Sequence, residues 1–138
     1  MPGRAGVSGE VSVAHVLVVD DDDDVRSVVR KVITKLGHQV WDVADGNEAL
    51  RILETSPVDL IISDVYMAAM DGMELLVRIQ QLELDVPVVV ISGGGYKPRD
   101  EVLKMAAACG AVATLDKPFT VEQLRETVEP LLPAPGKK

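Results

Sequence analysis

The residues of this chain that could perform chemistry are acidic, hydroxyl and amino side chains at the ends of apolar runs. Asp20 and Asp21 follow one such run, and Asp64 ends another. Ser92 and Lys117 come at the ends of two further runs. Carboxylates that lie close together repel one another and raise each other's pKa unless a cation intervenes. If these run ends meet in the fold, they predict a site for a hard divalent cation, with a hydroxyl and an ammonium group beside it.

Magnesium fits this set better than calcium, because Mg²⁺ takes few carboxylates, keeps several waters and binds together with phosphate groups. A calcium-binding EF-hand would need Gly at the sixth loop position and an acid at the twelfth. Counted from Asp20, these positions hold Val25 and Lys31, which excludes that loop. The run Asp20 to Asp24 could also be an acidic capping turn of a helix. Capping accounts for Asp22 to Asp24, but not for two acids that end a buried strand.

Lys117 precedes a proline and follows an apolar strand, so its ammonium group is expected to point into the acidic cluster. There it could form an ordinary ion pair with Asp64, or bind an added phosphoryl group. Ser92 has no base beside it in the sequence, which argues against a serine nucleophile. A carboxylate can itself attack phosphorus, while nearby cations neutralise the charge of the transferring group. Asp64 stands apart from the aspartate run and is the best placed to be that nucleophile.

The size and composition of the chain suit one domain. It has 138 residues, 47% of them hydrophobic, which is enough for a real core. The formal net charge of −8 argues against direct binding of nucleic acid, which needs a basic surface. The single cysteine, Cys109, allows neither a disulfide framework nor a zinc cluster. No apolar stretch reaches the roughly 18 residues of a membrane span, and the N-terminus lacks a signal-peptide core, so we expect a cytoplasmic protein without membrane contact.

Apolar strands and amphipathic helices alternate along the chain and must position these side chains. Strands are predicted at His15 to Val19, Gln39 to Ala44, Val58 to Asp64, Pro87 to Ile91 and Ala111 to Leu115. Helices are predicted at Asp22 to Gly37, Asn47 to Leu53, Asp71 to Leu82, Pro98 to Gly110 and Val121 to Leu132. This alternation predicts a doubly wound α/β fold, with helices on both faces of a parallel sheet. Ligands bind at the carboxyl edge of such sheets, which is where the polar residues above are expected to meet.

Four short motifs in this order resemble the receiver domain of two-component response regulators. They are Val18-Val19-Asp20-Asp21, Ile62-Ser63-Asp64 with Met70-Asp71-Gly72, Val90-Ile91-Ser92, and Lys117-Pro118-Phe119. Each motif alone is weakly specific, but four in order at strand ends are specific together. The resemblance covers residues 15–132 and implies a flavodoxin-like (βα)5 fold with strand order 2-1-3-4-5. It leaves residues 1–14 as a flexible extension and 133–138 as a short tail.

The resemblance implies that Asp64 accepts a phosphoryl group from a histidine kinase or a histidine phosphotransfer protein, in a Mg²⁺-dependent reaction. It implies a metal site made of three carboxylates and one backbone carbonyl: Asp20, Asp21, Asp64 and Tyr66. Ser92 and Lys117 are expected to contact the phosphoryl group and couple it to the surface that binds a downstream protein. Such a domain is a signalling switch that assists its own phosphorylation and dephosphorylation, rather than an enzyme.

Three positions depart from the usual receiver pattern. Ala68 stands where a proline is common, Gly93 to Gly95 replace an alanine followed by polar or acidic residues, and Thr114 replaces an aromatic residue. These departures remove no catalytic group and bear on how the switch is transmitted. No output domain follows Leu132, so we expect a single-domain receiver unless the chain is part of a longer protein.

Two other interpretations stay open from the residues alone. A phosphohydrolase of the haloacid-dehalogenase type also uses a strand-end aspartate, Mg²⁺ and a lysine. Its signature needs Asp-x-Asp-x-Thr or Val, whereas this chain has Asp20-x-Asp22-x-Asp24. A receiver-like module that binds partners without phosphorylation is the other alternative, and the complete acidic set with Ser92 and Lys117 argues against it. Repeated turnover of small phosphoesters would distinguish the hydrolase from a switch.

Overall fold

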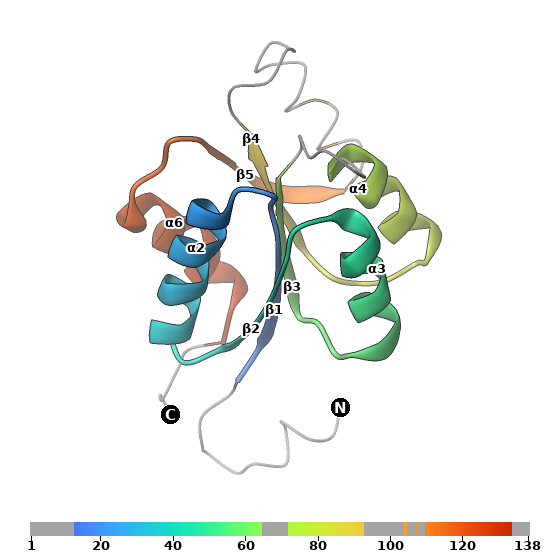
Figure 1. Ribbon diagram of the computed structural model, residues 1–138, viewed down its shortest axis with the longest axis horizontal. Helices are drawn as coiled ribbons and strands as arrows, with labels where there is room; N and C mark the ends of the chain where they lie inside the picture. Colours follow the sequence, from blue (N-terminus) through green and yellow to red (C-terminus); the bar gives the residue numbers. More distant parts are fainter. Residues whose placement is uncertain (1–12, 65–71, 93–103, 105–106, 108–109, 134–138) are drawn as a thin grey trace.

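The structure is a computed structural model that describes residues 13–64, 72–92, 104, 107 and 110–133 (Figure 1). Its strands are β1 (His15–Val19), β2 (Gln39–Val43), β3 (Leu60–Asp64), β4 (Val88–Ser92) and β5 (Ala111–Asp116). Its helices are α2 (Asp23–Lys35), α3 (Gly46–Thr55), α4 (Gly72–Gln81) and α6 (Val121–Val128), and the 3₁₀ helix η1 (Glu129–Leu131) follows. Among these described helices, none is long and apolar enough to cross a membrane.

The five strands form one parallel sheet in the order β2-β1-β3-β4-β5. This confirms the predicted flavodoxin-like strand order. Helices α2 and α6 cover one face of the sheet, and α3 and α4 cover the other (Figure 1). Strand β1 pairs with both β2 and β3, so the chain leaves β1 toward one edge and later returns to build the other. Such a reversal opens a crevice at the carboxyl ends of the two neighbouring strands.

The central strands β1, β3 and β4 supply half of the buried hydrophobic residues in the described part of the chain. Val16 and Val18 pack with α2 and α6, whereas Leu17 and Val19 pack with α3 and α4. Consecutive side chains of a strand point to opposite faces, so an unbroken apolar run fills both layers. All five residues of β3 are buried, including its last residue, Asp64. The core therefore fixes this strand end firmly in the middle of the sheet.

Helix α2 begins directly after the first acidic residues. The side chain of Asp22 accepts hydrogen bonds from the backbone N–H groups of Asp24 and Val25, which makes it the N-cap. Free N–H groups of a first turn favour carboxylate partners in this position. This confirms the prediction that Asp22 to Asp24 form the cap and first turn of the helix. Asp20 and Asp21 precede this cap.

Two helix predictions need correction. The prediction of one helix from Val121 to Leu132 is wrong, because α6 ends at Val128 and the chain continues as η1. Pro130 has no N–H group to donate to an α-helix, and a tighter 3₁₀ turn tolerates it near its start. Helix α3 continues to Thr55, two residues beyond the predicted end at Leu53. The predicted helix from Pro98 lies outside the described residues, apart from Lys104 and Ala107, which are helical.

Candidate functional site

The carboxyl edge of the sheet brings together four of the residues predicted from the sequence. Asp20 follows β1, Asp64 ends β3, and Ser92 ends β4. Lys117 follows β5, and its backbone N–H donates to the carbonyl oxygen of Ser92 at 2.7 Å. Because all strands run in the same direction, these ends lie along one edge. The side chains of Asp20, Asp64 and Lys117 contact one another as predicted, whereas Ser92 joins this edge through its backbone and its hydroxyl contacts another residue.

The side chain of Lys117 lies between two buried carboxylates. Its Nζ is 3.1 Å from Asp64 Oδ2 and 3.3 Å from Asp20 Oδ2. The two acidic side chains are almost completely buried, at 5% and 0% exposure. Burial acts to lower the pKa of Lys117, but the charges of Asp64 and Asp20 outweigh it, so the pKa is raised. The amine is therefore a stable ammonium ion.

Asp20 is held in an environment that disfavours its negative charge. Burial raises its pKa to about 6, and the nearby charge of Asp64 adds to this, while the N–H of Asp22 and the ammonium of Lys117 act in the opposite direction. Its Oδ1 accepts from the N–H of Asp22 at 2.9 Å. Its Oδ2 is buried and, among the described groups, makes the ion pair with Lys117 without a well-aligned hydrogen bond. This buried carboxylate oxygen can thus still coordinate a further cation through a lone pair.

A metal ion has three acidic ligands available at this edge. One oxygen from each of Asp20, Asp21 and Asp64 lies within 4.8 Å of the other two. Asp21 is exposed, whereas the other two are buried. Carboxylates on one side and solvent on the other suit a cation that keeps part of its water shell, as Mg²⁺ does. Tyr66, the carbonyl ligand implied by the resemblance, lies outside the described residues, as do Ala68 and Gly93 to Gly95.

Ser92 is oriented by a residue that the sequence analysis did not single out. Its hydroxyl donates to Asp116 Oδ1 at 3.1 Å. Ser92 and Asp116 are register partners at the ends of β4 and β5. A one-residue irregularity in this pairing makes Val88 and Val89 face Ala111 and Ala113, and this shift brings Ser92 opposite Asp116. The sequence shows only that an acid, Asp116, directly precedes Lys117. Its pairing with Ser92 depends on the register shift and could not be predicted from that position alone.

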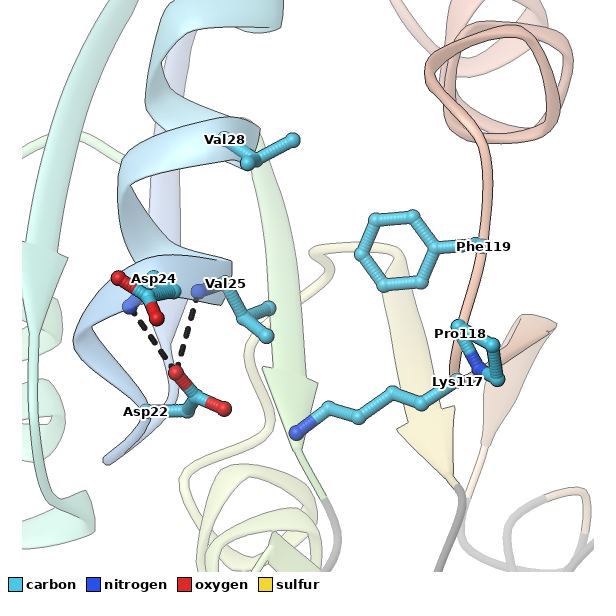
Figure 2. Close-up of a pocket in the computed structure, with 7 residues that line it drawn as sticks. All are labelled: Asp22, Asp24, Val25, Val28, Lys117, Pro118 and Phe119. Atoms are coloured by element: carbon cyan, nitrogen blue, oxygen red, sulfur yellow. Dashed lines mark hydrogen bonds between the residues drawn. The ribbon is translucent and has the colours of Figure 1, made fainter.

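A cleft beside Lys117 was also missed. It has a volume of about 530 Å³ and lies between the start of α2 and the connection from β5 to α6 (Figure 2). Its lining residues are Asp22, Asp24, Val25, Val28, Lys117, Pro118 and Phe119. Val28 falls at the helical spacing of the core residues of α2, yet it is 39% exposed. The apolar stripe of α2 is therefore wider than the core, and its edge forms one wall of this cleft.

A parallel α/β sheet with strand order 2-1-3-4-5 defines a flavodoxin-like domain, and the acidic cluster and ammonium group at its carboxyl edge have the chemistry that suits a cation and a phosphoryl group. The family model of the response regulator receiver domain matches residues 16–129, and the chain belongs to this family. Receiver domains of this family are phosphorylated on an aspartate. They take the phosphoryl group from histidine kinases or phosphotransfer proteins and generally bind Mg²⁺ at an acidic pocket.

Relatives of known type agree with this assignment. The transcriptional regulatory protein GlrR of Escherichia coli (strain K12) is 35% identical over 86% of this chain, which spans only 26% of that protein. Sporulation initiation phosphotransferase F of Bacillus subtilis (strain 168) is 29% identical, over 86% of this chain and 93% of its own length. The solved structure of the Vibrio cholerae chemotaxis protein CheY4 superposes with a TM-score of 0.76 at 34% identity, covering 87% of this chain and 99% of that one.

The raised pKa of Asp20 predicts that Asp20→Asn stabilises the metal-free protein at neutral pH. An acid whose folded pKa is about 6 instead of 3.8 favours folding below pH 3.8, and this contribution is lost as the pH rises through 6. The variant removes this loss, so its free energy of unfolding should exceed that of the parent by on the order of 2 kcal/mol at pH 7.5. The gain should shrink toward pH 4.5.

Urea unfolding with a metal chelator at both pH values measures this difference. Asp24→Asn, which changes an exposed acid of the same run, is the matched control and should gain much less. A loss of stability in Asp20→Asn that is equal at pH 7.5 and pH 4.5 would contradict the described environment of Asp20.

Proposed function

We propose that Asp64 is the phosphoryl acceptor of this receiver domain. The observation that carries the proposal is the contact of 3.1 Å between Asp64 Oδ2 and Lys117 Nζ, at the end of the central strand. An acceptor needs a fixed carboxylate and a cation that neutralises the incoming charge. Asp64 is fixed by the buried strand β3 and has that cation in contact. Residues 15–132 form the receiver domain in this proposal. We also propose that the protein is located in the cytoplasm.

In the proposed reaction, an oxygen of Asp64 attacks the phosphorus of a phosphohistidine on the donor protein. The new O–P bond forms as the N–P bond breaks, and the histidine leaves as neutral imidazole when its other nitrogen carries a proton. Lys117 can then move its contact from the carboxylate to the phosphoryl oxygens, because both lie within reach of one ammonium group. Its raised pKa supports this role, since the amine stays charged throughout.

We assign the proposed Mg²⁺ site to Asp20, Asp21 and Asp64. When bound, Mg²⁺ supplies positive charge that offsets the charge of the transferring phosphoryl group. The residues of the chain do the positioning: Asp22 donates its N–H to Asp20 Oδ1, and Arg26 donates to the backbone carbonyl oxygen of Asp20 at 2.8 Å. These two contacts fix the loop that carries both acidic ligands.

The donor is proposed to be a histidine kinase or a phosphotransfer protein. The cleft beside Lys117 supports this, because Val25, Val28 and Phe119 give it an apolar wall next to the site (Figure 2). A protein that carries phosphohistidine can bury apolar surface there while its phosphoryl group reaches the acidic edge. We infer that the outcome is a changed affinity for a downstream protein and a single modification per molecule, rather than repeated hydrolysis of phosphoesters.

The assignment of Asp64 predicts that Asp64→Asn abolishes phosphoryl uptake. Incubation of the parent with acetyl phosphate and Mg²⁺ should add the mass of one phosphoryl group, since the parent keeps the carboxylate that attacks phosphorus. The amide of the variant is a poor nucleophile and should stay unmodified in the intact mass spectrum. Asp59→Asn, a matched change directly before the opposite end of β3 and thus remote from the edge, should be modified like the parent. Equal uptake by Asp64→Asn and the parent would refute the assignment.

The metal assignment predicts that two neighbouring aspartates differ sharply. Asp21→Ala should abolish Mg²⁺-dependent phosphorylation, because it removes a ligand that lies within 4.8 Å of the two others. Asp23→Ala should retain most of it, because Asp23 belongs to the first turn of α2 and pairs with Arg26. The measurement is the rate of uptake from acetyl phosphate as a function of Mg²⁺ concentration. An equal loss in both variants would mean that the run acts only as a diffuse negative charge.

A further inference from the structure

The hydroxyl group of Ser92 is already engaged in the unmodified protein. Ser92 is only 4% exposed, and its Oγ donates to Asp116 Oδ1 at 3.1 Å. The backbone of the two strand ends is tied at the same place, because Lys117 N donates to Ser92 O at 2.7 Å. Register partners in a sheet carry their side chains on the same face, so this contact follows from the strand pairing. The serine hydroxyl is thus held by β5.

A serine hydroxyl has one proton to donate. The resemblance to receiver domains implies that this proton serves a phosphoryl oxygen on Asp64, whereas the structure gives it to the carboxylate of Asp116. Both acceptors are anionic, so each forms the stronger, charge-assisted type of hydrogen bond. The two acceptors therefore compete for one donor.

We propose that Asp116 is a positioning residue that holds the Ser92 hydroxyl in the unmodified state, so that a phosphoryl group on Asp64 must displace it. This inference rests on the proposed function of Asp64. Asp116 would then affect how readily the phosphorylated state of Asp64 forms, because its hydrogen bond to Ser92 must first break.

The surroundings of Asp116 allow such an exchange. The residue is only partly buried. It borders a hollow of about 270 Å³ between β5 and α6, which is also lined by Thr114, Gln123, Glu126 and Thr127. The carboxylate can turn away from Ser92 into this polar space, although the like charge of Glu126 works against that move. The position usually occupied by an aromatic residue in the family pattern holds Thr114, so its small side chain, rather than a ring, borders this hollow.

The test is a double-mutant cycle of the parent, Asp116→Ala, Ser92→Ala and the double variant. The probe is beryllofluoride with Mg²⁺, which mimics the phosphoryl group of an aspartyl-phosphate, and ¹⁹F NMR reports its affinity. Release of a hydroxyl from a charged acceptor should make Asp116→Ala bind about tenfold more tightly than the parent. Asp116→Asn should be intermediate, because its amide oxygen still accepts a weaker, uncharged hydrogen bond. In the Ser92→Ala background, Asp116→Ala should change the affinity by much less.

An equal gain in both backgrounds would overturn the inference, because it would reflect only the removal of a negative charge near an anion. Urea unfolding of the same four unmodified proteins is the second readout. It should show a coupling between the two positions of about tenfold in the unfolding equilibrium constant, and its absence would show that the hydrogen bond does not hold Ser92. If the parent itself does not bind beryllofluoride, the proposed function of Asp64 fails and this inference falls with it. If the parent binds but the cycle shows no coupling, only the role of Asp116 is refuted.

Discussion

The ammonium group of Lys117 between Asp64 and Asp20 is the interaction on which the rest of the site depends. Parallel strand pairing forces the ends of β1 and β3 together, so two buried carboxylates become neighbours whether or not their charges are balanced. Removing one partner of a buried ion pair leaves an uncompensated charge at a high cost. Lys117 supplies the balancing charge from β5, two strands away from β3 in the sheet. The same cation that lets the acids coexist is the one that the proposed function uses to bind the phosphoryl group.

The charges at this edge are incompletely balanced, and this imbalance is what supports the proposed metal site. Among the described residues, Asp20 and Asp64 share the ammonium group of Lys117, and Asp21 lies beside them. The pKa of Asp20 is raised mainly by burial, and the nearby charge of Asp64 adds to this. A divalent cation relieves this imbalance, so binding and stability are linked. The acidic start of α2 adds nothing to the imbalance inside the site, because Asp22 caps the helix and Asp23 pairs with Arg26. The five consecutive aspartates thus fall into two groups: Asp20 and Asp21 belong to the acidic cluster, and Asp22 to Asp24 begin helix α2.

The sequence predicted the fold and the main site because both depend on local signals. Apolar runs with acids, a serine or a lysine at their ends indicate buried parallel strands, and parallel pairing places those ends at one edge. The role of Asp116 escaped prediction because it depends on register: the irregularity after Val88 decides which residue of β5 faces Ser92. The exposure of Val28 escaped because helical periodicity marks an apolar face without saying how much of it the neighbouring elements cover. Local sequence patterns therefore predict neither the register of strands that are distant in the sequence nor the extent to which an apolar helix face is covered.

The central claim is that Asp64 carries the phosphoryl group, and chemical mapping of the modified residue tests it most directly. The parent protein is treated with acetyl phosphate and Mg²⁺ and then with borohydride, which reduces an acyl phosphate to an alcohol. Peptide sequencing by tandem mass spectrometry locates the reduced side chain. The account predicts conversion of Asp64 into homoserine, with Asp20 and Asp21 unchanged. Reduction at Asp20 or Asp21 with Asp64 intact would contradict it.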